Sequence, residues 1–526
     1  MRSLLSLRRY RFLLLLCSGV LMGLTLIFPG KLGFLQWVAF IPLAIALDAI
    51  VSDKRTTFLG AYFYGFTFFM FLYIMNYHWF WSMYPLDFTE LSRFYALCVI
   101  LLASLGLPVL AAFSGGFTFV FALFAKRSKT LSRFGFAHFL TFSLSYAFFE
   151  WTQIHFFTGV PWGRLAIGQT GSSVVLSSVS FLGSYFLSFI IVLVNSSLAY
   201  ALLNRSRKGA ALALASLALI FSMGIAGYAL SFTGEGKKVK AAAVQGNMAS
   251  QEKWSSDSTF IAATRYTELS EKAIEEGASV IVWPESVFPH STKHPDAYSC
   301  VTSLTEKYDV ELYYGCLSYD KEGRTFNAMA FASNGKIDLD NFYYKRHLVP
   351  FGEYVPLRDF VRVVFPMLDQ VSMLSDDVIP GEDSNLFDSK YGKIGALICF
   401  DSIYEPAALD AVRDGAELIV IGTNDSWFFD SSGVYMHNAQ AQIRACETGR
   451  YIVRSANTGV SSVIDARGNI LDIEPPLQEG YVIADVTFRS AKTLYTYVGN
   501  LFVYIAIFLI AIPPVLCFYE KIKKKK

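Results

Sequence analysis

IGALICFDS, the sequence of residues 394–402, is an apolar run that ends at Cys399 and is followed by Asp401 and Ser402. An apolar run of this length is typical of one buried strand. In α/β proteins the reactive groups lie beyond the carboxyl ends of such strands. We therefore expect a strand that carries Cys399 to the edge of a cleft.

Two further stretches have the same design. Glu285 follows the apolar run VIVWP at residues 280–284, and Lys345 follows the aromatic run FYY at residues 342–344. Proline cannot continue a strand ladder, so Pro284 ends the strand and turns the carboxylate of Glu285 toward a cleft. All three polar residues are thus expected where strands end.

Each of these residues has an ordinary structural explanation when it is taken alone. A cysteine that ends an apolar strand is usually a small buried filler, a glutamate there usually caps a helix, and a lysine is usually solvated. The combination points to chemistry, because a thiol is a weak nucleophile until a neighbouring base deprotonates it. We expect Glu285 to take that proton and Lys345 to stabilise an oxyanion.

The chain around these residues alternates short apolar runs with helical stretches, which is typical of an α/β domain. The segment from 231 to 495 has about 265 residues, enough to bury its own core. We expect strands at 239–245, 278–283, 312–317, 327–332, 394–399, 418–423, 451–455, 461–465 and 481–486, and helices at 258–276, 406–414 and 435–449.

The chain as a whole has the composition of a membrane protein. Of its 526 residues 53% are hydrophobic and only 17% charged, with a mean hydropathy of +0.40. A membrane-spanning helix needs roughly 20 apolar residues. We expect eight such spans, seven before residue 231 and one after 495, at 12–28, 35–51, 58–77, 94–124, 136–151, 174–203, 210–228 and 499–518.

Basic residues occur in every second loop between these spans. They are Arg2, Arg8, Arg9 and Arg11; Lys54 and Arg55; Lys126, Arg127, Lys129 and Arg133; Arg205, Arg207 and Lys208; and Lys521 with Lys523 to Lys526. The positive-inside rule places these loops and both termini in the cytoplasm, and the 231–495 segment outside it. A cleavable signal peptide would imitate the first span, but no convincing small-residue cleavage site precedes the second.

These features give a three-part organisation: a membrane domain of seven helices at 1–230, a catalytic domain at 231–495, and an eighth helix with a basic tail at 496–526. The formal net charge is only +2 and gives no indication of a nucleic-acid partner. The seven cysteines lack CxxC spacing and the seven histidines lack an HExxH motif, so we expect neither a metal nor another cofactor. Spacing leaves open whether Cys300 and Cys316 pair.

Three motifs carry a resemblance to a known family. WPE at 283–285, Lys345 with PFGE at 350–353, and CFD at 399–401 resemble, in order and spacing, the Glu, Lys and Cys blocks of the nitrilase superfamily. Within it the chain is most similar to the bacterial apolipoprotein N-acyltransferase family, its membrane-embedded branch. Further blocks that carry this likeness are GVPW at 159–162, QGN at 245–247, residues 350–356, TNDSWF at 423–428, Arg444, and NTG at 457–459.

The resemblance covers almost the whole chain and implies an external α-β-β-α sandwich on eight membrane spans. It implies that Glu285 is the base, Lys345 the oxyanion-stabilising cation, Cys399 the nucleophile that becomes a thioester, and Glu353 a second carboxylate of the site. The family usually has Tyr then Glu after the nucleophile, whereas this chain has Phe400 and Asp401 as supporting residues. The change excludes a hydrogen bond from a tyrosine hydroxyl at that position.

Other parts of the site follow from the same resemblance. Trp254, Trp427 and Asn424 would contact the substrate, although ordinary aromatic packing explains both tryptophans equally well. The apolar connection at 361–374 has two explanations that we weigh evenly: it dips into the outer leaflet and admits acyl chains, or it packs on its own domain.

The activity implied by the resemblance is the transfer of an acyl chain in the bacterial cytoplasmic (inner) membrane. The donor would be a phospholipid, and the acceptor the N-terminal α-amino group of a diacylglyceryl-cysteine apolipoprotein. A membrane-tethered amidase or nitrile hydrolase with the same triad is the main alternative. A transporter or receptor with a ligand-binding external domain is another, but it leaves the Glu, Lys and Cys pattern unexplained.

Overall fold

The structure is a computed structural model that describes residues 7–87, 89, 91–155, 160–231, 236–249, 252, 257–291, 295–364 and 377–524. The chain divides into two compact units. The membrane unit comprises residues 1–78, 102–230 and 498–526, and the catalytic unit comprises residues 79–101 and 231–497. The segment Trp79–Leu101, which we counted with the membrane domain, therefore packs with the catalytic unit.

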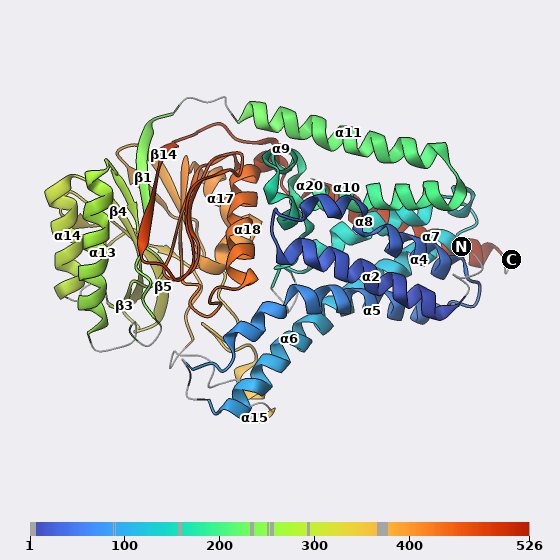
Figure 1. Cartoon of the computed structure of the whole chain (residues 1–526), viewed down its shortest axis with the longest axis horizontal. Coiled ribbons are helices and arrows are strands. Elements are labelled where there is room, and N and C mark those ends of the chain that lie inside the picture. Colours follow the sequence, from blue (N-terminus) through green and yellow to red (C-terminus); the bar gives the residue numbers. More distant parts are fainter. Residues whose placement is uncertain are drawn as a thin grey trace. The chain divides into compact units, whose positions relative to one another are not determined.

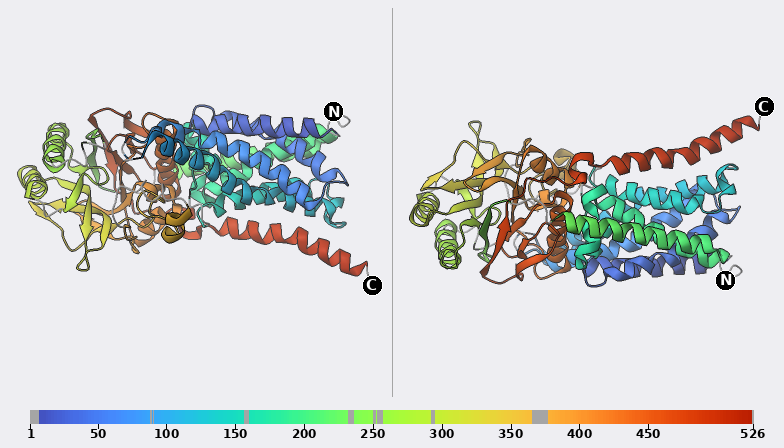
Figure 2. Two further views of the ribbon diagram at one scale, coloured as in Figure 1. Left: turned by 90° about the horizontal axis from the view of Figure 1, so that it is seen from below. Right: turned by 90° about the horizontal axis from the view of Figure 1, so that it is seen from above.

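The membrane unit is a bundle of apolar helices (Figures 1 and 2). Its helices are α2 (Arg8–Ile27), α3 (Gln36–Ala39), α4 (Ile41–Ser52), α5 (Phe58–Asn76), the later part of α6 (Arg93–Gly115), α7 (Phe117–Arg127), α8 (Ala137–Thr152), α9 (Ser173–Ser177), α10 (Val179–Asn204), α11 (Arg207–Leu230) and α20 (Leu501–Lys523). Large apolar side chains on the bundle surface, such as Leu214 and Phe508, are about two-thirds exposed. Such a surface suits lipid as its solvent.

Seven segments of the described chain are long and apolar enough to cross a membrane: Arg8–Ile27, Gly33–Ser52, Phe58–Asn76, Arg93–Arg127, Val179–Asn204, Arg207–Leu230 and Leu501–Lys523. They match seven of the eight expected spans, and the chain is a multi-pass membrane protein. The exception is the expected span at 136–151, which forms α8. This helix has only 16 residues, and 12 of them are buried.

The catalytic unit is built on two mixed β-sheets. The first has the strand order β14-β1-β2-β4-β5-β6, with β3 paired to β4 and β7 paired to β5; the second has the order β13-β12-β11-β10-β9-β8. Their bounds are β1 (Lys238–Gln245), β2 (Val280–Val282), β3 (Phe288–Ser291), β4 (Glu311–Tyr319), β5 (Thr325–Ser333), β6 (Lys336–Ile337), β7 (Tyr343–Tyr344), β8 (Leu386–Ser389), β9 (Gly392–Ile398), β10 (Leu418–Thr423), β11 (Ile452–Ala456), β12 (Ser461–Ile464), β13 (Ile470–Glu474) and β14 (Gly480–Thr487).

The sheets pack face to face and helices cover both outer faces, which gives four layers. Helices α13 (Ser258–Glu275) and α14 (Pro295–Tyr308) lie on the first sheet, and α17 (Glu405–Asp414) and α18 (Ser432–Thr448) lie on the second (Figure 1). Strand β1 is buried on both of its faces. Ala241 and Ala243 face the other sheet, while Ala242 and Val244 face the helices. The unit is the expected α-β-β-α sandwich.

All nine strands and all three helices expected in this unit are present, with ends shifted by a few residues. The sequence did not predict β3, β6, β7, β8 or β13, nor helices α14 and α15 (Arg358–Val364). Strands β9, β10 and β11 are parallel to one another, with Ile394 beside Leu418 and Ile419 beside Ile452. Their carboxyl ends therefore share one edge of the sheet, where Cys399 lies.

Candidate active site

Glu285 lies in the turn that follows β2, between the two sheets. Gly315 of β4 and Gly422 of β10 make room for this turn, because a Cβ atom at Gly315 would come within 2.6 Å of Glu285 Cα. A Cβ atom at Gly422 would come within 3.2 Å of the Glu285 backbone nitrogen. The turn therefore requires a glycine on each sheet.

A buried ammonium group joins Glu285 to a second carboxylate. Lys345 Nζ lies 2.8 Å from Glu285 Oε1 and 2.7 Å from Glu353 Oε2, and the lysine side chain is only 1% exposed. Asn327 Nδ2 donates to Glu285 Oε1 and to Glu353 Oε1, at 2.7 Å in each case. Backbone N–H groups donate as well, from Asn424 to Glu285 Oε2 and from Val349 to Glu353 Oε2. The structure thus brings Glu285, Lys345 and Glu353 together, as expected.

The cluster holds two carboxyl groups against one cation, and this shifts their protonation. Burial raises the pKa of Glu353, and the neighbouring Glu285 adds to the rise, although Lys345 opposes it. Burial alone would lower the pKa of Lys345, but the charges of Glu285 and Glu353 outweigh burial and raise it well above its usual value. Lys345 is therefore held as a cation, while Glu353 holds a proton more readily than an ordinary glutamate does.

Cys399 ends β9 and opens the short 3-10 helix η5 (Cys399–Ile403). Its backbone has a φ of 48°, in the left-handed region that a non-glycine residue rarely adopts. Burial raises the pKa of the Cys399 thiol, and the charge of Glu285 raises it further, whereas Lys345 lowers it. The sulfur is thus within electrostatic reach of both groups and rests as a thiol, so it needs a base to react.

Comparisons with known proteins identify both halves of the chain. Residues 18–197 match the model described as the apolipoprotein N-acyltransferase N-terminal domain, and residues 240–495 match that of the carbon-nitrogen hydrolases. An apolipoprotein N-acyltransferase of Allorhizobium ampelinum is 32% identical over 74% of this chain and 74% of its own length. The chain belongs to the apolipoprotein N-acyltransferase family. The resemblance drawn from the sequence motifs is confirmed.

Two other relatives describe the extent of the likeness. An apolipoprotein N-acyltransferase of Geobacter metallireducens is 28% identical over 98% of this chain and 96% of its own length. The crystal structure of Saccharomyces cerevisiae Nit3, a member of branch 10 of the nitrilase superfamily, covers 48% of this chain and 91% of its own, with 21% identity and a TM-score of 0.37. The likeness to the acyltransferase thus includes the membrane unit.

The two residues after Cys399, Phe400 and Asp401, have different surroundings. Phe400 is nearly buried and packs edge-on against Tyr404, with ring centroids 5.5 Å apart. Asp401 is fully buried; it accepts hydrogen bonds from Tyr343 Oη at 2.8 Å and from the backbone N–H of His347 at 2.7 Å. Asp401 therefore ties the nucleophile turn to the chain on either side of Lys345.

The residues expected to contact substrate are only partly described. Asn424 is half-buried, donates its backbone N–H to Glu285 and accepts from Asn457 Nδ2 at 3.2 Å. Trp427 is half-buried beside the Glu353 loop, since a Cβ at Gly352 would lie 3.2 Å from its ring. Trp254 lies outside the described residues.

Part of the apolar connection at 361–374 forms the end of α15. Val361 is 7% exposed and packs with Val355, whereas Val363 is 82% exposed. The described part therefore both packs on its unit and presents an apolar surface. Residues 365–374 lie outside the described residues.

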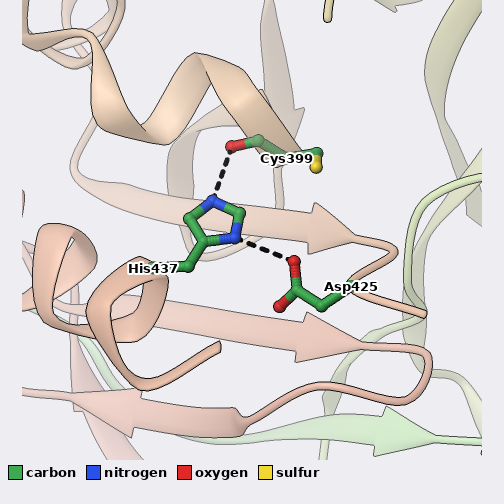
Figure 3. A group of neighbouring side chains, drawn as sticks. All are labelled: Cys399, Asp425 and His437. Atoms are coloured by element: carbon green, nitrogen blue, oxygen red, sulfur yellow. Dashed lines mark hydrogen bonds and ion pairs between the residues drawn. The ribbon is translucent and has the colours of Figure 1, made fainter. Parts of the chain in front are cut away.

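Sequence reasoning missed three polar residues beside the site. Asn327, at the start of an expected strand, bridges the two carboxylates. Asp425 and His437 lie behind Cys399 and hydrogen-bond to each other (Figure 3). Asp425 belonged to the TNDSWF motif, which was a signal, but His437 lies on α18 with nothing in its neighbourhood to single it out. All seven cysteines lie among the described residues and none of them forms a disulfide there, so Cys300 and Cys316 are not paired with each other.

Proposed function

We propose that this chain moves an acyl chain from a membrane phospholipid, through a thioester on Cys399, to the N-terminal α-amino group of a diacylglyceryl-cysteine apolipoprotein. The observation that carries the proposal is the buried cluster of Lys345 with Glu285 and Glu353, whose charges act on the Cys399 thiol. The cluster occurs in a member of the apolipoprotein N-acyltransferase family whose described residues include seven segments of membrane-spanning length, and this supports lipid substrates.

The first half-reaction forms the acyl-enzyme. Glu285 takes the proton of the Cys399 thiol, and the sulfur forms a bond to the ester carbonyl carbon of the phospholipid. The Lys345 ammonium stabilises the negative oxygen of the tetrahedral intermediate. The carbon–oxygen ester bond then breaks, Glu285 gives its proton to the departing lysophospholipid, and an acyl thioester remains.

The second half-reaction consumes the thioester. The α-amino group of the acceptor attacks the thioester carbonyl, and Glu285 takes a proton from the nitrogen. The carbon–sulfur bond breaks, an amide is left on the acceptor, and the Glu285 proton returns to Cys399. Glu353 and Asn327 hold the side chains of Lys345 and Glu285 in place through both steps.

A membrane location supplies more than an anchor in this proposal. Both substrates carry acyl chains, so a bilayer concentrates them beside the same thiol. Exclusion of water protects the thioester from hydrolysis. Phe360 and Val363 of α15, which are 58% and 82% exposed, are the described apolar side chains that we assign to contact with lipid.

We further propose that the chain lies in the bacterial inner membrane with both termini in the cytoplasm and the catalytic unit on the periplasmic side. The support is the basic character of every second loop, from Arg8 and Arg9 at the first helix to the lysines after the last. Cysteine accessibility at engineered sites in these loops, measured in intact cells, tests the orientation.

The test of the activity uses the full-length protein in lipid nanodiscs and a phospholipid with an alkyne-labelled acyl chain. We expect a hydroxylamine-sensitive label on the wild-type protein that disappears when a diacylated lipopeptide is added and reappears as an amide on that peptide. An N-acetylated lipopeptide is the matched control and should not discharge the label. Release of free fatty acid or hydrolysis of small amides, without transfer, would instead support the amidase alternative.

A further inference from the structure

Three buried side chains form a connected group behind the nucleophile. His437 of α18 lies 2.8 Å from Asp425 through its Nδ1 atom, and its Nε2 atom lies 3.2 Å from the carbonyl oxygen of Cys399 and 3.1 Å from Ser402 Oγ. His437 and Asp425 are each 1% exposed, and Ser402 is fully buried. Figure 3 shows that the carbonyl oxygen of Cys399, not its sulfur, faces the histidine ring.

The partners fix the protons on this ring. Asp425 presents a carboxylate to Nδ1, and a carboxylate only accepts, so Nδ1 donates. The carbonyl of Cys399 also only accepts, and Ser402 Oγ already gives its own proton to that carbonyl at 2.7 Å. Nε2 therefore donates as well. The ring is therefore held between the Asp425 carboxylate and the Cys399 carbonyl, with an acceptor facing each nitrogen.

Asp425 is held in place to accept from His437. Arg454 Nη2 lies 2.9 Å from Asp425 Oδ2, and Thr423 Oγ1 donates to Asp425 Oδ1 at 3.1 Å. Burial alone would raise the pKa of the Asp425 carboxyl, but the charges of His437 and Arg454 outweigh burial and hold it well below its usual range. The carboxylate is thus ionised and its oxygens are engaged.

A metal is a poor occupant for this group, although Cys399, Asp425 and His437 offer ligand atoms within 4.8 Å of one another. A histidine that ligates a metal gives up the proton on one nitrogen. Here both nitrogens face acceptors, and Asp425 already accepts from Arg454 and Thr423. The arrangement suits a fixed hydrogen-bond chain.

This series of hydrogen bonds ends at one of the strained backbone positions near the active site. Cys399 keeps a φ of 48°, a conformation that a non-glycine residue keeps only where its surroundings hold it there. Ser402 and His437 both donate to its carbonyl and so fix the peptide plane that follows the nucleophile. We propose that His437, locked by Asp425, is the positioning residue that holds Cys399 in this conformation and aims its sulfur at Glu285 and Lys345.

This inference rests on the proposed function only for its substrate, and a pair of polar variants tests it. Glutamine at 437 places an amide N–H where Nε2 was and keeps the donor to Cys399. Asparagine places one where Nδ1 was and keeps only the donor to Asp425. We expect His437→Gln to form the thioester within about 10-fold of the wild-type kcat, and His437→Asn about 100-fold more slowly than wild type at unchanged phospholipid KM, because a misplacement of about 1 Å can cost that much.

If His437 served only as a hydrogen-bond donor to buried Asp425, His437→Asn would form the thioester faster than His437→Gln. The proposal is overturned if His437→Asn acylates as fast as His437→Gln, or if both match the wild type. If neither variant folds, Ser402→Ala takes their place, since it removes the other donor to the Cys399 carbonyl. It should lower the acylation kcat about 10-fold at an unchanged melting temperature, and wild-type kcat in that variant contradicts the proposal.

Two controls separate this proposal from others. His138 of the membrane unit is also buried and lies 3.0 Å from Asp48, so His138→Gln and His138→Asn report the general cost of losing a buried imidazole and should leave kcat unchanged. Alkylation of Cys399 by iodoacetamide, followed by peptide mass spectrometry, measures the same positioning without any lipid. If the wild type forms no thioester, the proposed function fails. The positioning role is still supported if the alkylation rate of Cys399 drops in His437→Asn and not in His437→Gln. Equal alkylation rates in the two variants overturn it.

Discussion

Replacing Lys345 with methionine removes the ammonium group that lies 2.8 Å from Glu285 Oε1 and 2.7 Å from Glu353 Oε2. The two carboxylate side chains are only 8% and 12% exposed, so water cannot replace the lost cation. Breaking a buried ion pair from one side costs about 3–5 kcal/mol. For a unit of this size that corresponds to a fall in melting temperature on the order of 10 °C.

The same substitution should remove catalysis by a separate route. Loss of one preorganised oxyanion donor typically slows the chemical step about 10²–10³-fold. The double variant Lys345→Met/Glu353→Gln separates the two effects, because it leaves only one buried carboxylate, Glu285, which keeps hydrogen bonds from Asn327 and Asn424. We expect the double variant to recover about half of the lost stability and none of the activity.

The assay pairs thermal unfolding in detergent with the rate of thioester formation from labelled phospholipid. Glu353→Gln alone serves as the matched control for the second substitution. The reasoning is refuted if Lys345→Met melts with the wild type, or if the double variant regains more than a tenth of the wild-type acylation rate.

Three further predictions concern the same cluster. Cys399→Ala should abolish the acyl-enzyme and Cys399→Ser should leave at most a trace, because serine is far harder to deprotonate; hydroxylamine-sensitive labelling measures both, and labelling of the alanine variant at the wild-type rate contradicts the assigned nucleophile. Glu285→Gln should stay folded and form the thioester about 10²–10⁴-fold more slowly; unchanged labelling kinetics rule out Glu285 as the base. Burial raises the pKa of Glu353 above 4.5, so the folded protein binds this proton more tightly than the unfolded chain, and stability falls as pH rises through the window above 4.5. Melting curves across that window should show this slope in the wild type and a shallower one in Glu353→Gln, and parallel curves speak against it.

The sequence was sufficient to predict site residues that directly follow a buried apolar run. Glu285, Lys345 and Cys399 each follow an apolar or aromatic run, which marked all three residues. The strands before Glu285 and Cys399 were predicted with them, whereas β7 before Lys345 has only two residues and was not. All nine expected strands are present for the same reason. Strand β13 escaped because its residues ILDIE alternate between exposed and half-buried positions at a sheet edge, where no continuous apolar run marks them.

Contacts made across the sandwich could not be predicted in this way. Asn327 reaches Glu285 from 42 positions away, and His437 reaches the Cys399 carbonyl from 38 positions away and from a helix on the outer face of the second sheet. Single-residue patterns do not encode which side chains the second sheet brings opposite the first. The packing of Trp79–Leu101 with the catalytic unit was missed because apolar character alone places a segment in a membrane domain.

The central claim is that Cys399 carries the acyl group between donor and acceptor, and peptide mass spectrometry of the trapped intermediate tests it most directly. Wild-type protein incubated with one defined phospholipid should yield a peptide containing Cys399 that is heavier by that acyl chain, and a chase with diacylated lipopeptide should move the whole increment to the peptide amine. An unmodified Cys399 during active transfer, or transfer at the wild-type rate by Cys399→Ala, would contradict the account.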